Sequence, residues 1–285
     1  MFDHNESLEQ ARERNINDAL LEDIGTGDWT AMLVPDSGLV RANLIVRQEA
    51  VLCGRAWFEG CLKKLDPSAT IAWKYAEGDL MKADTTVCEI AAKPRALLSA
   101  ERPAINFLQT LSWTASITRQ HVKAIEGASP NKHGCAVLDT RKTIPGLRQA
   151  QKYAVTVGGG KNQRLALWHG ILIKENHIAA AGGVSAAMKA AHALNSGVEI
   201  QIEVENMAEL QEALAAGAKN ILIDNFSLEQ MREAVAFTKG AALLEASGGV
   251  SLDQLKAIAA TGVDRISIGK LTKDVIAVDF SLRVQ

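Results

Sequence analysis

Charged residues and glycines follow six short apolar runs in the second half of the chain. Each run has three to seven apolar or β-branched residues, and a polar set comes directly after it. Charges beside buried strands are costly to desolvate unless they are paired or bind a ligand. Six such positions in succession therefore predict a ligand site built from strand ends. The polar sets are 139–142, 174–177, 203–206, 224–225, 245–249 and 269–270.

The charges in and around these sets indicate polyanionic substrates. A set of four cations faces a pair of carboxylates, which suits catalysis by positioning and charge stabilisation. The carboxylates can bind sugar hydroxyls or a Mg²⁺ ion carried by phosphates. For Asp224 alone, a helix N-cap is an equally open interpretation. The cations are Arg141, Lys142, Arg164 and Lys174, and the carboxylates are Glu203 and Asp224.

Two glycine turns after the last two runs predict a phosphate site. Barrel enzymes commonly bind phosphate on backbone N–H groups at the loops after their last strands. Glycine allows this close approach because it carries no Cβ atom. The turns are Ser247-Gly248-Gly249 and Ile268-Gly269-Lys270. The segment 158–161 lacks the Walker spacing, and we interpret it as a helix stop.

No sequence motif supplies a protein nucleophile. The chain has no Gly-x-Ser-x-Gly elbow, no His-Glu-x-x-His motif and no cysteine placed like a nucleophile. His169 and His177 are candidate acid–base groups, but a single histidine near a strand end more often packs or caps.

The six apolar runs alternate with helical segments such as 207–216 and 228–237. This alternation predicts parallel strands buried on both faces. Six strands are too few for an eight-stranded barrel, so an open barrel and a doubly wound sheet both remain. Residues 39–95 predict a small strand-rich region with a helix at 57–65. Helices are expected at 7–21 and over 97–126, with Pro103 near a helix start. A last strand is expected at 276–280.

The composition excludes several protein classes. Of 285 residues, 31 are Lys or Arg and 33 are Asp or Glu, which argues against a general nucleic-acid binder. The four cysteines form no metal-binding or disulfide pattern and suit a reducing compartment. The acidic start of the chain lacks the basic and apolar runs of a signal peptide, and no apolar run could span a membrane. We therefore expect a cytoplasmic protein.

Several motifs together closely resemble one family. The most specific are the Asp-Thr-Arg-Lys-Thr run at 139–143 and the Ile-Lys-Glu-Asn-His run at 173–177. On these motifs the chain resembles quinolinate phosphoribosyltransferase, over residues 22–282. Further matching segments are 101–109, 144–148, 152–155, 158–160, 202–206, 223–226, 244–250 and 261–264.

The resemblance implies an α/β fold of two domains. An N-terminal α/β sandwich domain would span 1–116, with 275–285 returning to it, and an open, incomplete parallel α/β barrel of about six strands would span 117–274. It also implies a homodimer in which Arg102 of one subunit completes the site of the other. The implied reaction joins quinolinate to phosphoribosyl pyrophosphate with Mg²⁺. Its products are nicotinate mononucleotide, pyrophosphate and CO₂, a step of NAD biosynthesis.

The resemblance also implies roles for single residues. Lys142, Glu203 and Asp224 would be catalytic, with both carboxylates at the ribose or its Mg²⁺. The pyridine nitrogen of quinolinate is itself the nucleophile, which accounts for the missing catalytic base. The other substrate-binding positions are Arg102, Thr140, Arg141, Gln163, Arg164, Lys174, Ser247, Gly248, Gly249, Ile268, Gly269 and Lys270.

Three positions depart from the family pattern and bear on substrate specificity. Gln163 stands where histidine is usual, Lys270 where alanine is usual, and Trp168 lies in a run that differs from the common one. A paralogue with another substrate is therefore one alternative. A Schiff-base aldolase using Lys174 and a phosphate-ligand-binding subunit without catalysis are two others.

Overall fold

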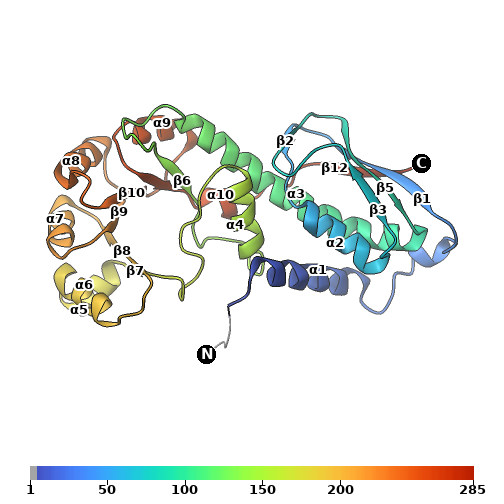
Figure 1. The fold of residues 1–285 in the computed structure, drawn as a ribbon, viewed down its shortest axis with the longest axis horizontal. Coiled ribbons are helices and arrows are strands. Elements are labelled where there is room, and N and C mark those ends of the chain that lie inside the picture. The colour runs from blue at the N-terminus through green and yellow to red at the C-terminus, as the bar shows by residue number, and fades with distance from the viewer. Residues whose placement is uncertain (1–4) are drawn as a thin grey trace. The chain divides into compact units, whose positions relative to one another are not determined.

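The computed structural model describes residues 5–285, which form two compact units (Figure 1). The first unit comprises the chain up to Arg119 together with Thr143–Gly159 and Leu271–Gln285. The second comprises Gln120–Lys142 and Gly160–Lys270. The first four residues of the acidic start used in the signal-peptide prediction lie outside the described part. Within residues 5–285, no helix is both long and apolar enough to cross a membrane.

The first unit is an antiparallel sheet packed with helices around one apolar core. The sheet order is β12-β1-β5-β3, and a separate pair joins β2 to β4. Strand β1 alternates buried and more exposed residues, as expected for a strand with one face on the core. The elements are α1 (Leu8–Ile24), η1 (Ala31–Leu33), β1 (Val40–Val46), β2 (Ala50–Val51), α2 (Arg55–Leu65), β3 (Thr70–Trp73), β4 (Leu80–Met81), β5 (Thr85–Ala92), α3 (Pro94–Ile125), α4 (Arg148–Val157) and β12 (Phe280–Val284).

Two sequence predictions for this unit were wrong. The last strand is β12 at Phe280–Val284 and not 276–280; it pairs antiparallel with β1. Val278 made the earlier segment look like a strand. It is buried, as a strand residue would be, but its N–H donates to Gln109 O of helix α3 at 3.2 Å. Pro103 lies inside α3, which starts at Pro94. A proline there removes only one helical hydrogen bond, and the long helix tolerates that loss.

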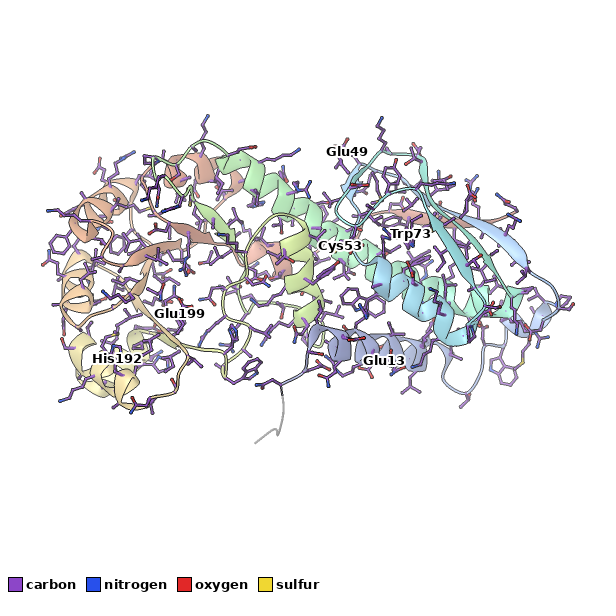
Figure 2. All side chains as sticks on the ribbon, in the orientation of Figure 1. Glu13, Glu49, Cys53, Trp73, His192 and Glu199 are labelled. Carbon is purple, nitrogen blue, oxygen red and sulfur yellow. The ribbon has the colours of Figure 1, made fainter. Side chains whose placement is uncertain are left out.

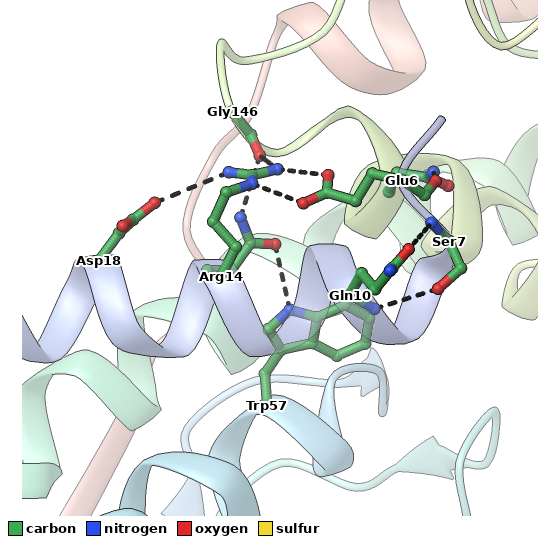
Figure 3. A network of polar contacts seen from close by, with 9 residues as sticks. Glu6, Ser7, Gln10, Arg14, Asp18, Trp57 and Gly146 are labelled. Carbon is green, nitrogen blue, oxygen red and sulfur yellow. Dashed lines mark hydrogen bonds and ion pairs between the residues drawn. The ribbon is translucent and has the colours of Figure 1, made fainter. Parts of the chain in front are cut away.

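The segment Thr143–Gly159 belongs to the first unit, whereas the sequence placed it within 117–274. Its helix α4 packs on the core: the Tyr153 ring lies 5.6 Å from the Trp57 ring, and its hydroxyl donates to Glu77 at 3.1 Å. The preceding loop is tied to α1, because Asn15 Nδ2 donates to Gly146 O at 3.0 Å. Arg14 also donates to Gly146 O, at 3.4 Å (Figure 3). These polar contacts could not be read from strand periodicity.

The second unit is a six-stranded parallel sheet in the order β6-β11-β10-β9-β8-β7, which confirms the predicted number of barrel strands. Edge strands β6 and β7 do not pair with each other within residues 5–285, so the barrel is open. The helices that follow the strands cover the outer face of the sheet (Figure 1). The elements are β6 (Ala136–Leu138), β7 (Gly170–Ile173), α5 (Glu175–Ala181), α6 (Val184–Ala193), β8 (Glu199–Val204), α7 (Met207–Ala215), β9 (Asn220–Asp224), α8 (Leu228–Thr238), β10 (Leu243–Ser247), η2 (Leu252–Gln254), α9 (Leu255–Ala259), β11 (Arg265–Ser267) and α10 (Lys270–Lys273), which starts at the boundary of the two units.

The register of this sheet places polar residues together on one face. Glu203 is aligned with Leu222, Leu222 with Glu245, and Glu245 with Arg265. Residues aligned across a parallel sheet share a face, so these side chains form one row. One step further along the strands, Asp224 is aligned with Ser247. The opposite face carries buried apolar residues such as Ile202, Ile223 and Ala246. Both faces are buried as predicted, but one of them is partly polar.

Candidate active site

Lys174 and Glu203 form an ion pair at the ends of neighbouring strands. Lys174 follows β7 directly, Glu203 lies near the end of β8, and the lysine Nζ is 3.2 Å from one carboxylate oxygen. Burial raises the pKa of the Glu203 carboxyl above its ordinary value, and Lys174 opposes this rise. The nearby charges of Asp224 and Glu175 add to the increase in this pKa. The two predicted carboxylates are thus neighbours, as a shared role at one ligand requires.

Asp224 is available for a ligand and is not a helix cap. Helix α8 starts at Leu228, and its N-cap is Ser227, whose hydroxyl accepts from Gln230 N. The N-cap interpretation of Asp224 is therefore wrong. Its side chain accepts one hydrogen bond, at 2.8 Å, from Asn225 Nδ2. Mg²⁺ in phosphate sites needs only one or two protein carboxylates besides phosphate oxygens and water, so Glu203 and Asp224 fit this ion. No cluster of three or more His, Cys, Asp or Glu side chains that could hold a metal occurs in the described part of the chain.

The two glycine turns lie where the sequence put them. Gly248 and Gly249 follow β10 with φ of 105° and 54°, which favours glycine. Gly269 follows β11 and lies against the loop after β6. A Cβ atom added to Gly269 would be 3.0 Å from Lys142 Cδ and 3.6 Å from Thr140 Oγ1. The structure therefore brings Thr140, Lys142 and Gly269 together.

Arg141 and Arg164 are two of the cations predicted for a site in the second unit. Burial lowers the pKa of the Arg164 guanidinium, and the charge of Arg141 lowers it further, so the two cations are close to each other. Arg164 is held in place because its Nη1 donates to Gly170 O of β7 at 2.9 Å. Two neighbouring guanidiniums favour a dianionic ligand, since arginine forms bidentate pairs with carboxylates.

A chain of polar side chains runs from Gln163 into the buried part of the sheet, and the sequence did not predict its middle member, Gln201. Gln163 Nε2 donates to Gln201 Oε1 at 2.7 Å, and Gln201 Nε2 donates to Glu245 at 2.9 Å. Gln163 N also donates to Asp139 Oδ1 at 2.9 Å. Gln201 lies inside an apolar run, which concealed it. Its two-residue spacing from Glu203 was the available signal, because residues i and i+2 of a strand share a face.

Three other predicted positions are exposed. Arg102 is an exposed residue of α3 in the first unit, and Lys270 is exposed at the start of α10. Trp168 is exposed and packs edge-on against the His169 ring at 5.5 Å. His177 has a local role, since its Nδ1 accepts from Lys174 N at 3.0 Å at the start of α5.

Comparison with known proteins decides the family. The family model described as the quinolinate phosphoribosyl transferase N-terminal domain matches residues 28–112, and that of the C-terminal domain matches 114–283. The chain belongs to the quinolinate phosphoribosyltransferase family.

Relatives of this quinolinate phosphoribosyltransferase family member match it over nearly its whole length. Quinolinate phosphoribosyltransferase (decarboxylating) 1b of Nicotiana tabacum is 35% identical over 289 residues, covering 93% of this chain and 80% of the relative. The solved nicotinate-nucleotide pyrophosphorylase of Francisella tularensis is 41% identical with a TM-score of 0.91, covering 99% of this chain and 100% of that one. NadC from Streptococcus pyogenes is 34% identical with a TM-score of 0.92 and covers 99% of each chain.

Proposed function

We propose that this protein transfers the phosphoribosyl group of phosphoribosyl pyrophosphate to quinolinate and releases pyrophosphate and CO₂. The product is nicotinate mononucleotide, so the enzyme is a pentosyltransferase of NAD biosynthesis. The observation that carries the proposal is the joint position of Lys174, Glu203 and Asp224 at the carboxyl ends of β7, β8 and β9. This is the edge at which parallel α/β sheets bind their ligands.

The arginines account for the choice of a dicarboxylate. Arg141 and Arg164 would bind the two carboxylates of quinolinate, each through charge-assisted hydrogen bonds. Their mutual repulsion, which lowers the pKa of Arg164, is relieved when a dianion lies between them. Nicotinate has one carboxylate and would leave one guanidinium without its anion.

The carboxylates account for the transfer step. The pyridine nitrogen attacks the anomeric carbon of the ribose as the bond to pyrophosphate breaks, through an oxocarbenium-like state. Glu203 and Asp224 would hold the ribose or its Mg²⁺ and stabilise this positive charge. Mg²⁺, when bound with the substrate, neutralises phosphate charge. Lys174 favours the ionised form of Glu203, because it opposes the rise in pKa that burial causes.

Decarboxylation needs no protein base. Alkylation gives the pyridine nitrogen a positive charge, which stabilises the carbanion left at C2 when CO₂ departs, and a proton then replaces the lost carboxylate. The turns with Gly248, Gly249 and Gly269 would bind phosphate through backbone N–H groups. Lys142, next to Gly269, would add a cation there. A Schiff-base role for Lys174 is disfavoured, because that chemistry needs a lysine desolvated in a dry pocket, whereas the Lys174 side chain is 45% exposed and pairs with Glu203.

The assembly proposed for this function is a homodimer. Arg102 is exposed on α3 and would complete the site of the partner subunit with one more cation. A cytoplasmic location suits the four cysteines, which are all free thiols.

The test is a turnover assay with quinolinate, phosphoribosyl pyrophosphate and Mg²⁺ that follows CO₂ and nicotinate mononucleotide together. We expect equimolar products, and their loss in Glu203→Gln. Nicotinate tested in parallel detects a paralogue with another preference. Folded protein that binds both substrates without forming product would overturn the proposal in favour of a ligand-binding subunit.

A further inference from the structure

Asn225 has a backbone conformation that few residues adopt. It directly follows Asp224 at the end of β9, and its φ is 56°. Residues other than glycine avoid this left-handed region, although asparagine tolerates it better than most. The side chain is exposed, so apolar burial does not hold it there. The conformation therefore needs another explanation.

The polar contacts of Asn225 supply that explanation. Its backbone N–H donates to Ser247 O at 3.2 Å, one position beyond the last aligned pair of β9 and β10, which is Asp224 with Ser247. Its side-chain Nδ2 donates to Asp224 Oδ2 at 2.8 Å. Asn225 thus holds both the Asp224 carboxylate at the end of β9 and Ser247 at the end of β10, where the glycine turn begins.

Gly248 shows how closely the two loops approach. A Cβ atom at Gly248 would lie 2.2 Å from Asn225 Oδ1 and 3.0 Å from Asn225 N. The backbone N cannot yield as the end of a flexible side chain can. Gly248 is therefore required by Asn225 as well as by its own φ of 105°. Phosphate approach, which explained this glycine in the sequence, is only part of the reason.

We propose that Asn225 is a positioning residue that joins Asp224 and the Ser247-Gly248 turn into one rigid element. The inference rests on the proposed function, in which Asp224 holds the ribose or its Mg²⁺ and the turn holds phosphate. These two groups belong to one substrate, phosphoribosyl pyrophosphate, so their spacing must match it. Asn225 fixes that spacing from outside the set of residues that touch the ligand, and it orients Asp224 by binding one of its two oxygens.

Asn225→Gly separates the two roles of the residue. Glycine adopts the same φ without strain, so the backbone turn is kept while the amide donor is lost. We measure binding of phosphoribosyl pyrophosphate with Mg²⁺ by calorimetry in the wild type, Asn225→Gly, Asp224→Asn and the double variant. Asn225→Gly should weaken this binding about tenfold, as for a lost hydrogen bond to a charged group. In the Asp224→Asn background the same change should have an effect of about twofold or less. Quinolinate binding should stay unchanged.

The matched control is Asn195→Gly. Asn195 is also an exposed left-handed asparagine of the second unit, with φ of 45°, and it follows α6. This change should leave substrate binding unaltered. If Asn225→Gly weakened binding equally in the wild-type and Asp224→Asn backgrounds, Asn225 would act only on the fold, and the inference would be overturned. If Asp224→Asn alone left binding unchanged, the proposed site would be wrong and the inference would fall with it.

Discussion

Glu245 is a buried carboxyl whose ionisation should cost the fold stability at neutral pH. It is 1% exposed, and burial raises its pKa above the ordinary value. Hydrogen bonds from Gln201 and Ser267 and the charge of Arg265 oppose this rise in pKa, while Glu199 adds to it. Because the folded protein binds the proton more tightly than the unfolded chain, the free energy of unfolding falls as pH rises between the two pKa values.

Glu245→Gln removes this ionisation and keeps the shape of the side chain. An ionised carboxylate in a protein interior costs several kcal/mol, of which a charge-assisted hydrogen bond offsets about 1.5–3 kcal/mol. The variant should therefore be more stable by about 1–2 kcal/mol at pH 8. For a chain of this size that corresponds to a Tm higher by about 2–3 °C. Near the ordinary glutamate pKa, about 4.3, both proteins carry a neutral group and the difference should vanish.

The assay is thermal unfolding of both proteins between pH 4.5 and 8, followed by circular dichroism. Glu199 is exposed at the start of β8 (Figure 2), but its charge adds to the rise in the Glu245 pKa, so its removal would itself act on Glu245. Glu233→Gln is the control, because Glu233 is an exposed carboxylate of α8 in the same unit. It should change Tm much less at every pH. A Tm difference that is constant with pH would show that it does not arise from ionisation of Glu245. A variant less stable than the wild type at pH 8 would show that Glu245 stabilises the fold as an ion beside Arg265.

Four further outcomes follow from the proposed site. Arg164→Ala should weaken quinolinate binding by about 2–5 kcal/mol, measured by calorimetry, and equal turnover of nicotinate and quinolinate would contradict the dicarboxylate clamp. Inactive Arg102→Ala and Lys174→Ala subunits should regain activity when mixed and exchanged, and no recovery after demonstrated exchange would place Arg102 in its own subunit's site. Gly269→Ala should fold normally yet weaken binding of phosphoribosyl pyrophosphate by about tenfold, because the added Cβ atom displaces the Lys142 side chain. Unchanged affinity would show that Lys142 does not belong to the phosphate site. Gln163→His should make the KM for quinolinate depend on pH between about 6 and 7, and profiles that superimpose would leave Gln163 as a structural neighbour.

The sequence predicted the strands of the second unit well, because their apolar runs are dense and separated by helices. It failed where tertiary contacts outweigh local pattern. Val278 looked like part of a strand but packs beside α3. The segment that carries α4 looked like part of the barrel, but hydrogen bonds of Tyr153 and Gly146 tie it to the first unit. Such partners are more than 70 positions away along the chain, so periodicity cannot reveal them.

The candidate site shows the same limit at the scale of single residues. Strand ends identified Lys174, Glu203 and Asp224 because charges after apolar runs are unusual. Asn225 belonged to the polar set at 224–225, but nothing in the sequence indicated its positioning role, since its left-handed backbone and its contact with Gly248 exist only in the folded chain. Gln201 was hidden for a different reason: one amide inside an apolar run has no visible effect on the pattern.

The position of a carboxylate within the sheet decides what it can do. Glu203 and Glu245 lie in the same row, both aligned with Leu222. Strands β8 and β10 both have a neighbour on each side, but β10 lies further from the β7 edge, and Glu245 is enclosed and bound by the amide of Gln201. Strand β8 lies beside the edge strand β7, whose end supplies Lys174, a side chain 45% exposed. Glu203 therefore keeps contact with solvent and with the exposed cation Lys174. A carboxylate that must bind a polyanionic substrate needs both of these contacts. Glu245 has neither, so its contribution is to orient Gln201 and, through it, Gln163.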